Sequence, residues 1–311
     1  MKLSFWAKMR SLFGGQARSK VEAGLDPPFL ALEITKHARE VAEKIRLGNE
    51  RDYRNPIFLH SIMPRAGSVF VGNIISLHPD ISAYPNEIWE SPFLESMDHI
   101  NGFSDHFFSS YANNRDSIGR DDFFVIFAAS YQRYLYDATP KDKVLFVKEP
   151  RTRFLPYFYE AFPDANLTLL VRDGRDLVNS TVESWPHFGF EEVCHRWAKC
   201  ARICLDFMKK YENSDRFILV KFEEVSEKPE SFVESMCKKF KVDFDKYPID
   251  KLETIPIQGS SALQVAGNVS WDPVKKPPSF NPIGRWNNWT DYRKKTFDSI
   301  AGEELRRLGY Q

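Results

Sequence analysis

The sequence predicts an α/β fold of three layers, in which a central, mostly parallel sheet of about five strands is flanked by helices. Short apolar runs of strand character alternate along the chain with longer stretches of helical periodicity. This alternation favours parallel strands, because each helix carries the chain back across a face of the sheet. Two of the strands also lead through a loop containing arginine and glycine into a helix. A chain of 311 residues is long enough to form one large core.

The first half of the chain contains two of the predicted strands. The Pro27-Pro28 pair marks a break in the chain, and the first helix follows it. The elements predicted in this half are a helix over residues 29–47, a strand over 56–62, a helix over 69–77 and a short strand over 81–84.

The second half predicts three more strands, each followed by a helix. Pro163-Asp164 ends one of these helices. The predicted elements are a strand over residues 144–148, a helix over 153–162, a strand over 166–172, helices over 175–184 and 190–211, a strand over 216–222 and a helix over 229–240.

We expect residues 25–311 to form a single domain that follows a flexible N-terminal arm, residues 1–24. Residues 101–122 are rich in Phe, Ser, Asn and Asp without clean periodicity, which indicates a substrate-side insertion near residues 84–134. Glycine, serine and proline in the segment near residues 256–286 predict a long closing loop.

The composition limits the classes of partner. With 43 basic and 43 acidic residues the formal charge is zero, so no overall field favours nucleic acid or an anionic membrane. An anionic ligand must therefore be recognised locally. No apolar run approaches the ~20 residues of a transmembrane helix. Residues 1–15 lack the apolar core of a secretory signal, and we interpret them as a frayed or partner-binding arm, with a membrane-surface helix as the alternative.

The titratable residues indicate no metal site. The four cysteines have no metal-ligand spacing, and the seven histidines form no HxH, HxxxH or HExxH pattern. We expect the cysteines to be buried thiols in a reducing compartment, which predicts a cytoplasmic protein.

The segment from Leu170 to Ser180 is the stronger of two candidate anion sites. It carries Arg172 and Arg175 where a strand becomes a helix. Free N–H groups and the positive end of the helix dipole meet at such a junction, and arginine adds a planar fork that matches phosphate. A salt-bridged helix start is the structural alternative.

The second candidate site lies about a hundred residues earlier, where a loop joins the strand over 56–62 to its helix. The loop supplies a basic residue in Arg65, close backbone approach at Gly67 and a hydroxyl in Ser68. No Gly-Lys-Ser/Thr sequence follows, so the loop is not a Walker A motif and an ATP-dependent kinase is disfavoured. Two anion sites on one sheet predict a ligand with phosphates at two places, such as a 3′-phosphorylated nucleotide.

These segments resemble the PAPS-dependent sulfotransferases, where PAPS is 3′-phosphoadenosine 5′-phosphosulfate. That family's first loop usually reads Pro-Arg/Lys-Ser-Gly-Thr-Thr, and its second reads Arg-Asp-Pro/Gly-Arg-Asp with a serine eight residues after the first arginine. Arg172 and Ser180 have that spacing, and the tail from Ile283 to Trp286 also resembles the family. The resemblance runs from about residue 56 to the C-terminus and implies a P-loop-like nucleotide-binding architecture.

The resemblance implies which residues bind PAPS. The first loop would hold the 5′-phosphosulfate, and the second loop and the tail would hold the 3′-phosphate. Ala66 and Val69 replace residues that usually carry hydroxyls, which weakens the expected binding. Phe70 and Phe222 fall where aromatic residues lie near adenine, although a core role for Phe70 is the alternative. The implied set is Arg65, Ala66, Gly67, Ser68, Val69, Phe70, Arg172, Ser180, Phe222, Gly284, Arg285 and Trp286.

The resemblance also implies the catalytic groups. Glu87, shortly after a His-Pro-Asp sequence, matches the glutamate base of Golgi-type carbohydrate and tyrosylprotein sulfotransferases. Arg65 and Lys148, the latter in a Lys-x-Pro segment, would stabilise the transferred charge. Alternative bases are Glu90, three residues after Glu87, and the histidines His60 and His99.

The predicted function is transfer of a sulfuryl group from PAPS to a hydroxyl or amine of a small-molecule metabolite, with release of PAP and without a metal. Glycan or lipid acceptors are the alternative within this class. A non-catalytic nucleotide-binding protein of the same fold is the alternative outside it. The sequence does not determine the oligomeric state.

Overall fold

The structure is a computed structural model that describes residues 31–48, 54–83, 90–111, 113, 117–265 and 268–311. The chain divides into two units, Met1–Leu32 and Glu33–Gln311, and every helix and strand given below belongs to the second. The predicted arm over residues 1–24 and the predicted base Glu87 lie outside the described residues.

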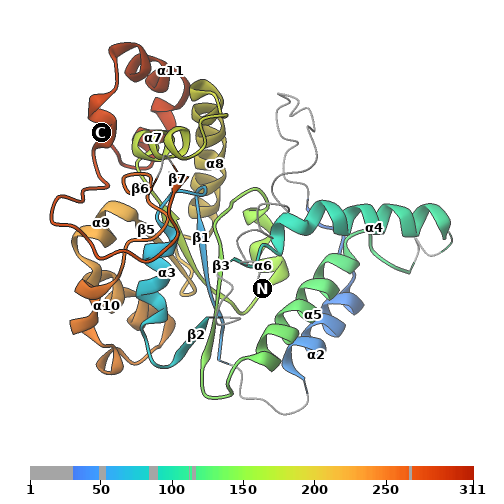
Figure 1. Cartoon of the computed structure of the whole chain (residues 1–311). Coiled ribbons are helices and arrows are strands. Elements are labelled where there is room, and N and C mark those ends of the chain that lie inside the picture. The colour runs from blue at the N-terminus through green and yellow to red at the C-terminus, as the bar shows by residue number, and fades with distance from the viewer. Residues whose placement is uncertain (1–30, 49–53, 84–89, 112, 114–116, 266–267) are drawn as a thin grey trace, which may run out of the picture. The chain divides into compact units, whose positions relative to one another are not determined.

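A five-stranded parallel sheet forms the centre of the second unit, with its strands in the order β2-β3-β1-β4-β5 (Figure 1). All side chains of the three central strands are buried, as expected for a parallel sheet that is covered on both faces. The predicted fold class is confirmed. The strands are β1 (Ile57–Ser61), β2 (Ile81–Ala83), β3 (Val144–Glu149), β4 (Asn166–Val171) and β5 (Phe217–Lys221).

Alternate side chains of β1 point to helices on opposite faces of the sheet. Leu59 faces α3 (Ser68–Ser76), where a Cβ added at Gly72 would lie 3.7 Å from Leu59 Cδ2. Phe58 faces the other side, and its ring centre lies 5.3 Å from that of Phe158 in α6 (Phe158–Ala161). Coverage on both faces explains why consecutive residues of the strand, Ile57, Phe58 and Leu59, are all apolar.

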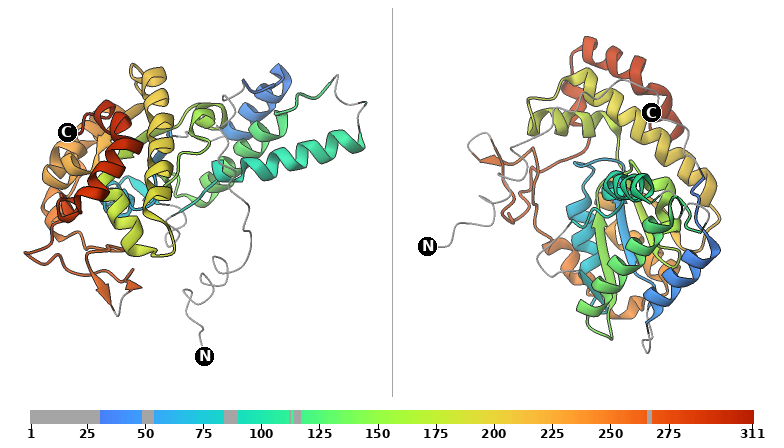
Figure 2. Two further views of the ribbon diagram at one scale, coloured as in Figure 1. Left: turned by 90° about the horizontal axis from the view of Figure 1, so that it is seen from above. Right: turned by 90° about the vertical axis from the view of Figure 1, so that its right-hand side faces the viewer.

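The remaining helices pack in groups around the sheet. Helix α2 lies against α5 (Figure 1), and α8 lies against α11 (Figure 2). In the described part of the chain, none of the helices is both long and apolar enough to cross a bilayer. These helices are α2 (Lys36–Leu47), α4 (Met97–Ser110), α5 (Asp122–Ala138), α7 (Gly174–Ser184), α8 (Phe190–Tyr211), α9 (Phe222–Glu227), α10 (Pro229–Phe240) and α11 (Asp291–Arg307).

The strand order brings the two predicted anion loops together. Strands β1 and β4 are neighbours in the sheet. The chain leaves β1 toward β2 on one side and leaves β4 toward β5 on the other, so the two connections run in opposite directions. The chain continues the β1–β4 pairing past the end of β1, because the Ile62 N–H donates to the Leu170 carbonyl at 2.8 Å. Ligands of open α/β sheets bind at such a switch point, beyond the carboxyl ends of the strands.

The first helix begins later than predicted, at Lys36 rather than residue 29. The Thr35 side chain caps it by accepting the Ala38 N–H at 3.1 Å. The Thr35 hydroxyl in turn donates to Asp122 at 2.8 Å. The helix start is therefore fixed by a contact with a residue far away in the sequence, which local periodicity does not reveal.

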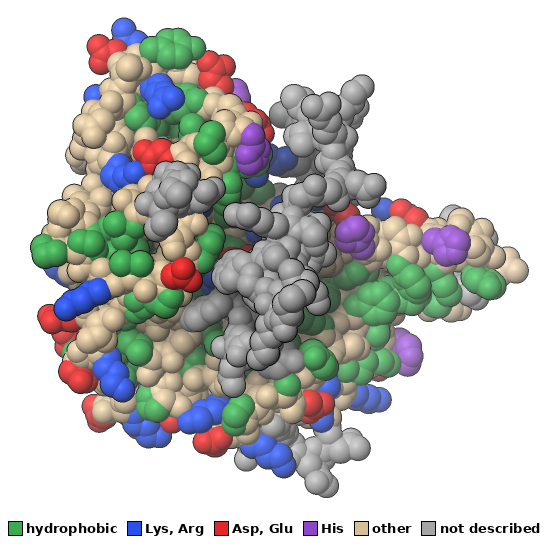
Figure 3. All heavy atoms as spheres, viewed as in Figure 1, with side chains coloured by type: hydrophobic (Ala, Val, Ile, Leu, Met, Phe, Trp, Pro, Cys, Tyr) green, Lys and Arg blue, Asp and Glu red, His purple; other side chains and the backbone are tan. Residues whose placement is uncertain are grey.

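The predicted irregular insertion contains a regular helix, α4. Its buried residues Met97, Ile100, Ser104 and Phe108 follow a helical spacing that the many polar residues obscure. The Glu149 carboxylate, at the end of β3, accepts backbone N–H groups of Leu94 at 3.3 Å and Glu95 at 3.2 Å just before this helix. The helix is thus anchored to the sheet. Figure 3 shows hydrophobic side chains gathered along α4 and α5, and the exposed ones among them include Phe103, Tyr111 and Phe127.

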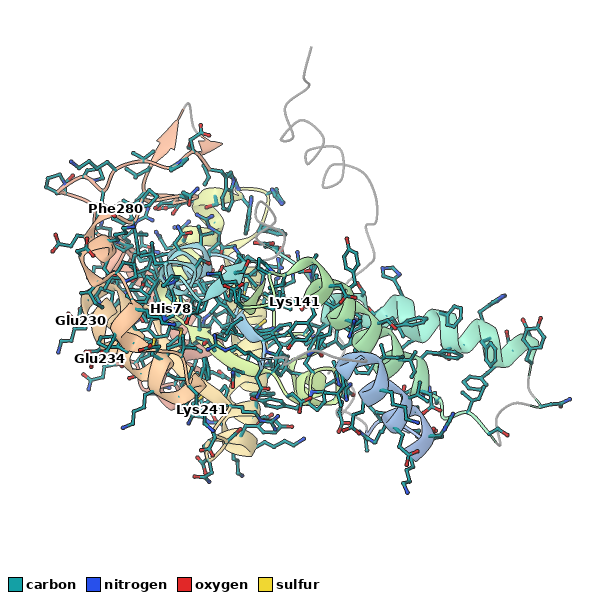
Figure 4. The ribbon with its side chains drawn as sticks, turned by 90° about the horizontal axis from the view of Figure 1, so that it is seen from below. His78, Lys141, Glu230, Glu234, Lys241 and Phe280 are labelled. Carbon is teal, nitrogen blue, oxygen red and sulfur yellow. The ribbon has the colours of Figure 1, made fainter. Side chains whose placement is uncertain are left out.

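His78, labelled in Figure 4, has a structural position in the turn after α3. Its Nδ1 accepts the Asp80 N–H at 3.0 Å, which leaves Nε2–H to donate to the Asp243 carbonyl at 2.8 Å. Both ring nitrogens are therefore engaged in tying the turn after α3 to the segment that follows α10.

Substitution of Gly174, the first residue of α7, should destabilise the fold. A Cβ at this position would lie 2.5 Å from Cε2 of the fully buried Trp197. We expect Gly174→Ala to lower the free energy of unfolding by about 1–3 kcal/mol through overpacking. Gly102→Ala is the matched control, because Gly102 lies within a helix where an added Cβ would have no described neighbour within 4 Å outside the backbone of its own helix. This substitution should raise the free energy of unfolding by about 0.5–1 kcal/mol. Urea unfolding measures both, and an unchanged midpoint for Gly174→Ala would contradict this packing.

Candidate active site

The first predicted loop turns sharply between β1 and α3. Gly67 is the N-cap of α3 and has a φ of 94°, a left-handed value that favours glycine. A Cβ at Gly67 would lie 2.3 Å from Cδ2 of Phe222, so glycine also permits the close approach of that ring. Ser68 begins α3, and both Ser68 and Ala66 are buried. The start of α3 is favourable for an anion because first-turn N–H groups have no partner within a helix.

Arg172, directly after β4, connects three separate segments. Its Nη1 donates to the Arg65 carbonyl at 2.8 Å, and its Nη2 donates to the Pro282 carbonyl at 2.6 Å. Its guanidinium carbon lies 4.6 Å from the ring centre of Phe222. The buried arginine therefore joins the first loop, the tail segment and the start of α9.

The tail loop is held by the second acidic residue of the Arg-Asp-Gly-Arg-Asp sequence. The Asp176 carboxylate accepts the N–H groups of Gly284 at 2.6 Å and Trp286 at 3.2 Å. Arg175 stacks on the Trp286 ring, with its guanidinium carbon 3.7 Å from the ring centre, and is paired with Asp173. Thus Asp176 and Arg175 position the tail, and Arg175 is engaged with protein partners.

Three arginines and two serines meet between these segments. Arg65 Nε donates to Ser180 Oγ at 3.4 Å, and Ser180 Oγ lies 3.1 Å from Ser261 Oγ. Arg285 Nη1 donates to the same Ser261 hydroxyl at 2.7 Å, and its Nη2 is paired with Glu183. The structure thus brings together four residues predicted from distant parts of the sequence, Arg65, Arg172, Ser180 and Arg285.

The positive charges in this arginine cluster repel one another in a buried place. Burial, together with the charges of Arg172 and Arg285, lowers the pKa of Arg65 to about 10 against the opposing effect of Glu183. Burial also lowers the pKa of Arg172, and its buried Nε has no hydrogen-bond partner among the described residues. A bound anion would relieve both unfavourable features. The cluster has the properties of a site for a phosphate group.

The two aromatic residues predicted near adenine lie together beside this loop. The ring centres of Phe70 and Phe222 are 6.2 Å apart in an edge-to-face arrangement. Phe70 and Val69 are half-buried, whereas Phe222 is buried against Gly67 and Arg172. Phe70 therefore keeps part of its ring available to a ligand, in contrast to a fully buried core phenylalanine.

Lys148, near the end of β3, is paired with one of the alternative bases. Its Nζ lies 3.6 Å from Glu90 Oε1, and the Lys148 carbonyl accepts the Ser91 N–H at 2.9 Å. The lysine side chain is almost fully buried, whereas that of Glu90 is 49% exposed. Burial lowers the pKa of Lys148, and the nearby charge of Glu90 raises it in part. A buried ammonium and a solvent-accessible carboxylate thus lie side by side.

The two histidines that were alternative bases occupy different environments. His60 is fully buried, its Nδ1 lies 2.9 Å from the Arg151 carbonyl, and burial lowers its pKa to about 4. It is therefore neutral near pH 7. His99 lies on an exposed part of α4.

Sequence reasoning missed several acidic residues and one serine at the site. Asp176, Glu183 and Glu223 hold the arginines or the loops, but a carboxylate near a predicted anion site gives no signal that it is needed. Ser261 lies in the closing loop, where several serines and glycines look alike in the sequence. Its contacts with Ser180 and Arg285 distinguish it from the other serines of this loop.

The comparisons with known proteins agree with this geometry. A sequence model described as the sulfotransferase family matches residues 56–246, which is more than half of the chain. The chain belongs to the sulfotransferase family. It is therefore a sulfotransferase enzyme, and the matched segment includes both anion loops and Lys148.

Individual relatives are distant. Protein-tyrosine sulfotransferase 1 of Danio rerio is 21% identical over 269 residues, which cover 82% of this chain and 72% of that protein. Among solved structures, the sulfotransferase domain from the Synechococcus PCC 7002 olefin synthase matches with a TM-score of 0.50 and 16% identity, covering 85% of this chain and 98% of that one. The sulfotransferase domain from the curacin biosynthetic pathway has a TM-score of 0.49 and 17% identity, covering 84% and 99%. The olefin synthase domain shows a shared fold.

The Glu149 carboxyl, which anchors the segment before α4, should make stability depend on pH. Burial raises its pKa to about 8. A folded-state pKa above the unfolded value gives stability that is lost as pH rises through the folded value. We expect the urea midpoint of the wild type to fall as pH rises from about 4.5, the ordinary carboxyl value, to about 8, and Glu149→Gln to flatten this fall. Parallel pH profiles for the two proteins would contradict the assignment of a protonated Glu149.

Proposed function

We propose that this sulfotransferase transfers a sulfuryl group from PAPS to a hydroxyl or amine of a small-molecule acceptor and releases PAP. One observation carries the proposal: Arg65, Arg172 and Arg285 converge with two serines, and Arg172 Nε is buried with no partner in the part of the chain that the structure describes. Such a cluster fits a phosphate group better than a neutral ligand.

The position of the arginine cluster supports a nucleotide that carries phosphate groups at both the 3′ and the 5′ position of its ribose. We assign the 3′-phosphate to the cluster, with Gly284 and Trp286 holding the tail against α7. The 5′-phosphosulfate is assigned to the start of α3, where the helix dipole and backbone N–H groups favour an anion. The residues that would hold it are Arg65, Ala66, Gly67, Ser68 and Val69, with Phe70 and Phe222 toward the adenine.

In the proposed reaction, bound PAPS supplies the sulfuryl group. The task of the protein is to align the acceptor, to accept its proton and to neutralise charge on the leaving phosphate. Arg65 is assigned to the phosphate charge. Lys148 is assigned to the same task, since burial against Glu90 holds its ammonium in one place. Glu87 is proposed as the base, with Glu90 as the alternative that contacts Lys148.

The acceptor class is inferred from the side chains of two helices and from one relative. Aromatic side chains along α4 and α5 would suit an apolar small molecule. The relative named protein-tyrosine sulfotransferase 1 favours a second candidate, the phenol of a peptide tyrosine. A panel of phenols, alcohols, amines and tyrosyl peptides incubated with PAPS and EDTA distinguishes these acceptors and tests the proposal that no metal is needed.

We also propose that the enzyme works in the cytoplasm. All four of its cysteines are free, and three of them are buried. Free thiols are typical of proteins from a reducing compartment.

Binding of PAP tests the proposed donor site. We expect the wild type to bind PAP more tightly than ADP, because only PAP carries a 3′-phosphate. Arg172→Ala should weaken PAP binding by about 10–150-fold, the effect of losing a charge-assisted hydrogen bond, and weaken ADP binding less, because ADP loses only the support that Arg172 gives to the first loop. Isothermal titration calorimetry measures both. Arg39→Ala is the control, since Arg39 forms an exposed ion pair with Glu160. Equal losses of PAP and ADP affinity in Arg172→Ala would contradict the 3′-phosphate assignment.

The base is tested by paired substitutions once an acceptor is known. A Gln variant of the true base, Glu87→Gln or Glu90→Gln, should lower kcat about 100-fold or more, because general base catalysis contributes that much. The other variant should keep turnover within a few-fold, and both should bind PAP like the wild type. Full turnover in both variants would exclude a glutamate base from this segment.

A further inference from the structure

The end of the chain returns to the junction that carries Arg172. The Tyr310 hydroxyl donates to Glu223 Oε2 at 2.9 Å, and the other oxygen, Glu223 Oε1, accepts the Asp173 N–H at 3.0 Å. One carboxylate therefore links the second-to-last residue of the chain to the residue that directly follows Arg172.

A defined turn directs Tyr310 to this place. After α11, the Tyr310 N–H donates to the Leu305 carbonyl at 3.1 Å and the Gly309 N–H donates to the Arg306 carbonyl at 2.9 Å. This pair of bonds is the Schellman arrangement that ends many helices, and Gly309 has the left-handed φ of 79° that the motif uses. Lys221 Nζ then donates to the Gly309 carbonyl at 3.2 Å. The C-terminal turn is thus fastened to the end of β5.

Glu223 contacts the residue that follows Arg172, and it is next in sequence to the residue whose ring lies beside the Arg172 guanidinium. It holds the backbone of Asp173 after Arg172, and it directly follows Phe222, whose ring centre lies 4.6 Å from the guanidinium carbon. Its negative charge also acts on Arg172 electrostatically. A carboxylate whose charge acts on an arginine is a potential competitor for any phosphate that the arginine binds. The two hydrogen bonds to Asp173 and Tyr310 direct its oxygens to other partners.

We propose that Tyr310 and Glu223 form a positioning pair for the 3′-phosphate site, in which the tyrosine hydroxyl keeps the glutamate from neutralising Arg172. The inference rests on the proposed function, because it concerns the site assigned to the 3′-phosphate. Neither residue is assigned a contact with the nucleotide. Without the hydroxyl, the released carboxylate oxygen turns toward the Arg172 guanidinium and competes with the 3′-phosphate.

Tyr310→Phe tests the pair with the smallest possible change. We expect the variant to bind PAP about five- to tenfold more weakly and ADP within about twofold of the wild type, as loss of one hydrogen bond to a charged group allows. Tyr292→Phe is the matched control, because Tyr292 is an exposed residue of α11 whose hydroxyl also donates to a glutamate, Glu191, at 3.0 Å. Calorimetry of both ligands and thermal unfolding of each variant supply the readouts.

A second substitution separates competition from a merely structural role. Glu223→Gln keeps an acceptor for the Asp173 N–H but removes the negative charge, so it should retain the preference for PAP over ADP. Added to Tyr310→Phe, it should restore that preference to within about threefold of the wild type, because no charge remains to compete. A structural role would instead make the double variant worse than either single one.

The outcomes distinguish this inference from the proposed function. A wild type that prefers PAP, together with a Tyr310→Phe variant of unchanged preference, overturns the positioning pair and leaves the proposed function standing. Equal losses of PAP and ADP affinity, or a double variant without recovery, also overturn it. A wild type that binds PAP no more tightly than ADP overturns the proposed function, and the inference with it.

Discussion

The buried guanidinium of Arg172 is the interaction on which the rest of the site depends. Its two terminal nitrogens donate to the carbonyls of Arg65 and Pro282, so it fixes the first loop and the tail relative to β4. These bonds leave Nε buried beside two other arginines, with no partner from residues 31–48, 54–83, 90–111, 113, 117–265 or 268–311. The same side chain therefore assembles the site and creates its need for an anion. Folding and binding are coupled through one residue.

Acidic residues surround the arginine cluster without filling it. Asp176 is engaged with tail N–H groups, Asp173 with Arg175, Glu183 with Arg285 and Glu223 with Asp173 and Tyr310. Each carboxylate therefore has a partner other than the Arg172 guanidinium. The four carboxylates therefore hold the loops and the neighbouring side chains in place, while the Arg172 guanidinium itself donates to the carbonyls of Arg65 and Pro282.

Much of the fold could be predicted from the sequence because its signals are local. The helices over residues 190–211 and 229–240 agree with α8 and α10, since acidic or proline-led starts and lysines in the last turns mark their ends. Arg172 and Ser180 could be predicted from their spacing. The anchoring of α4 by Glu149 and the meeting of Ser261 with Ser180 could not, because both depend on contacts across the fold.

A crystal structure of the protein with PAP tests the central claim most directly. We expect the 3′-phosphate to lie in the arginine cluster and to accept hydrogen bonds from Arg172 Nε, Ser180 Oγ and Arg285, while the carbonyls of Arg65 and Pro282 keep their bonds to Arg172. A 3′-phosphate bound elsewhere, with Arg172 Nε still unpartnered, would contradict the account.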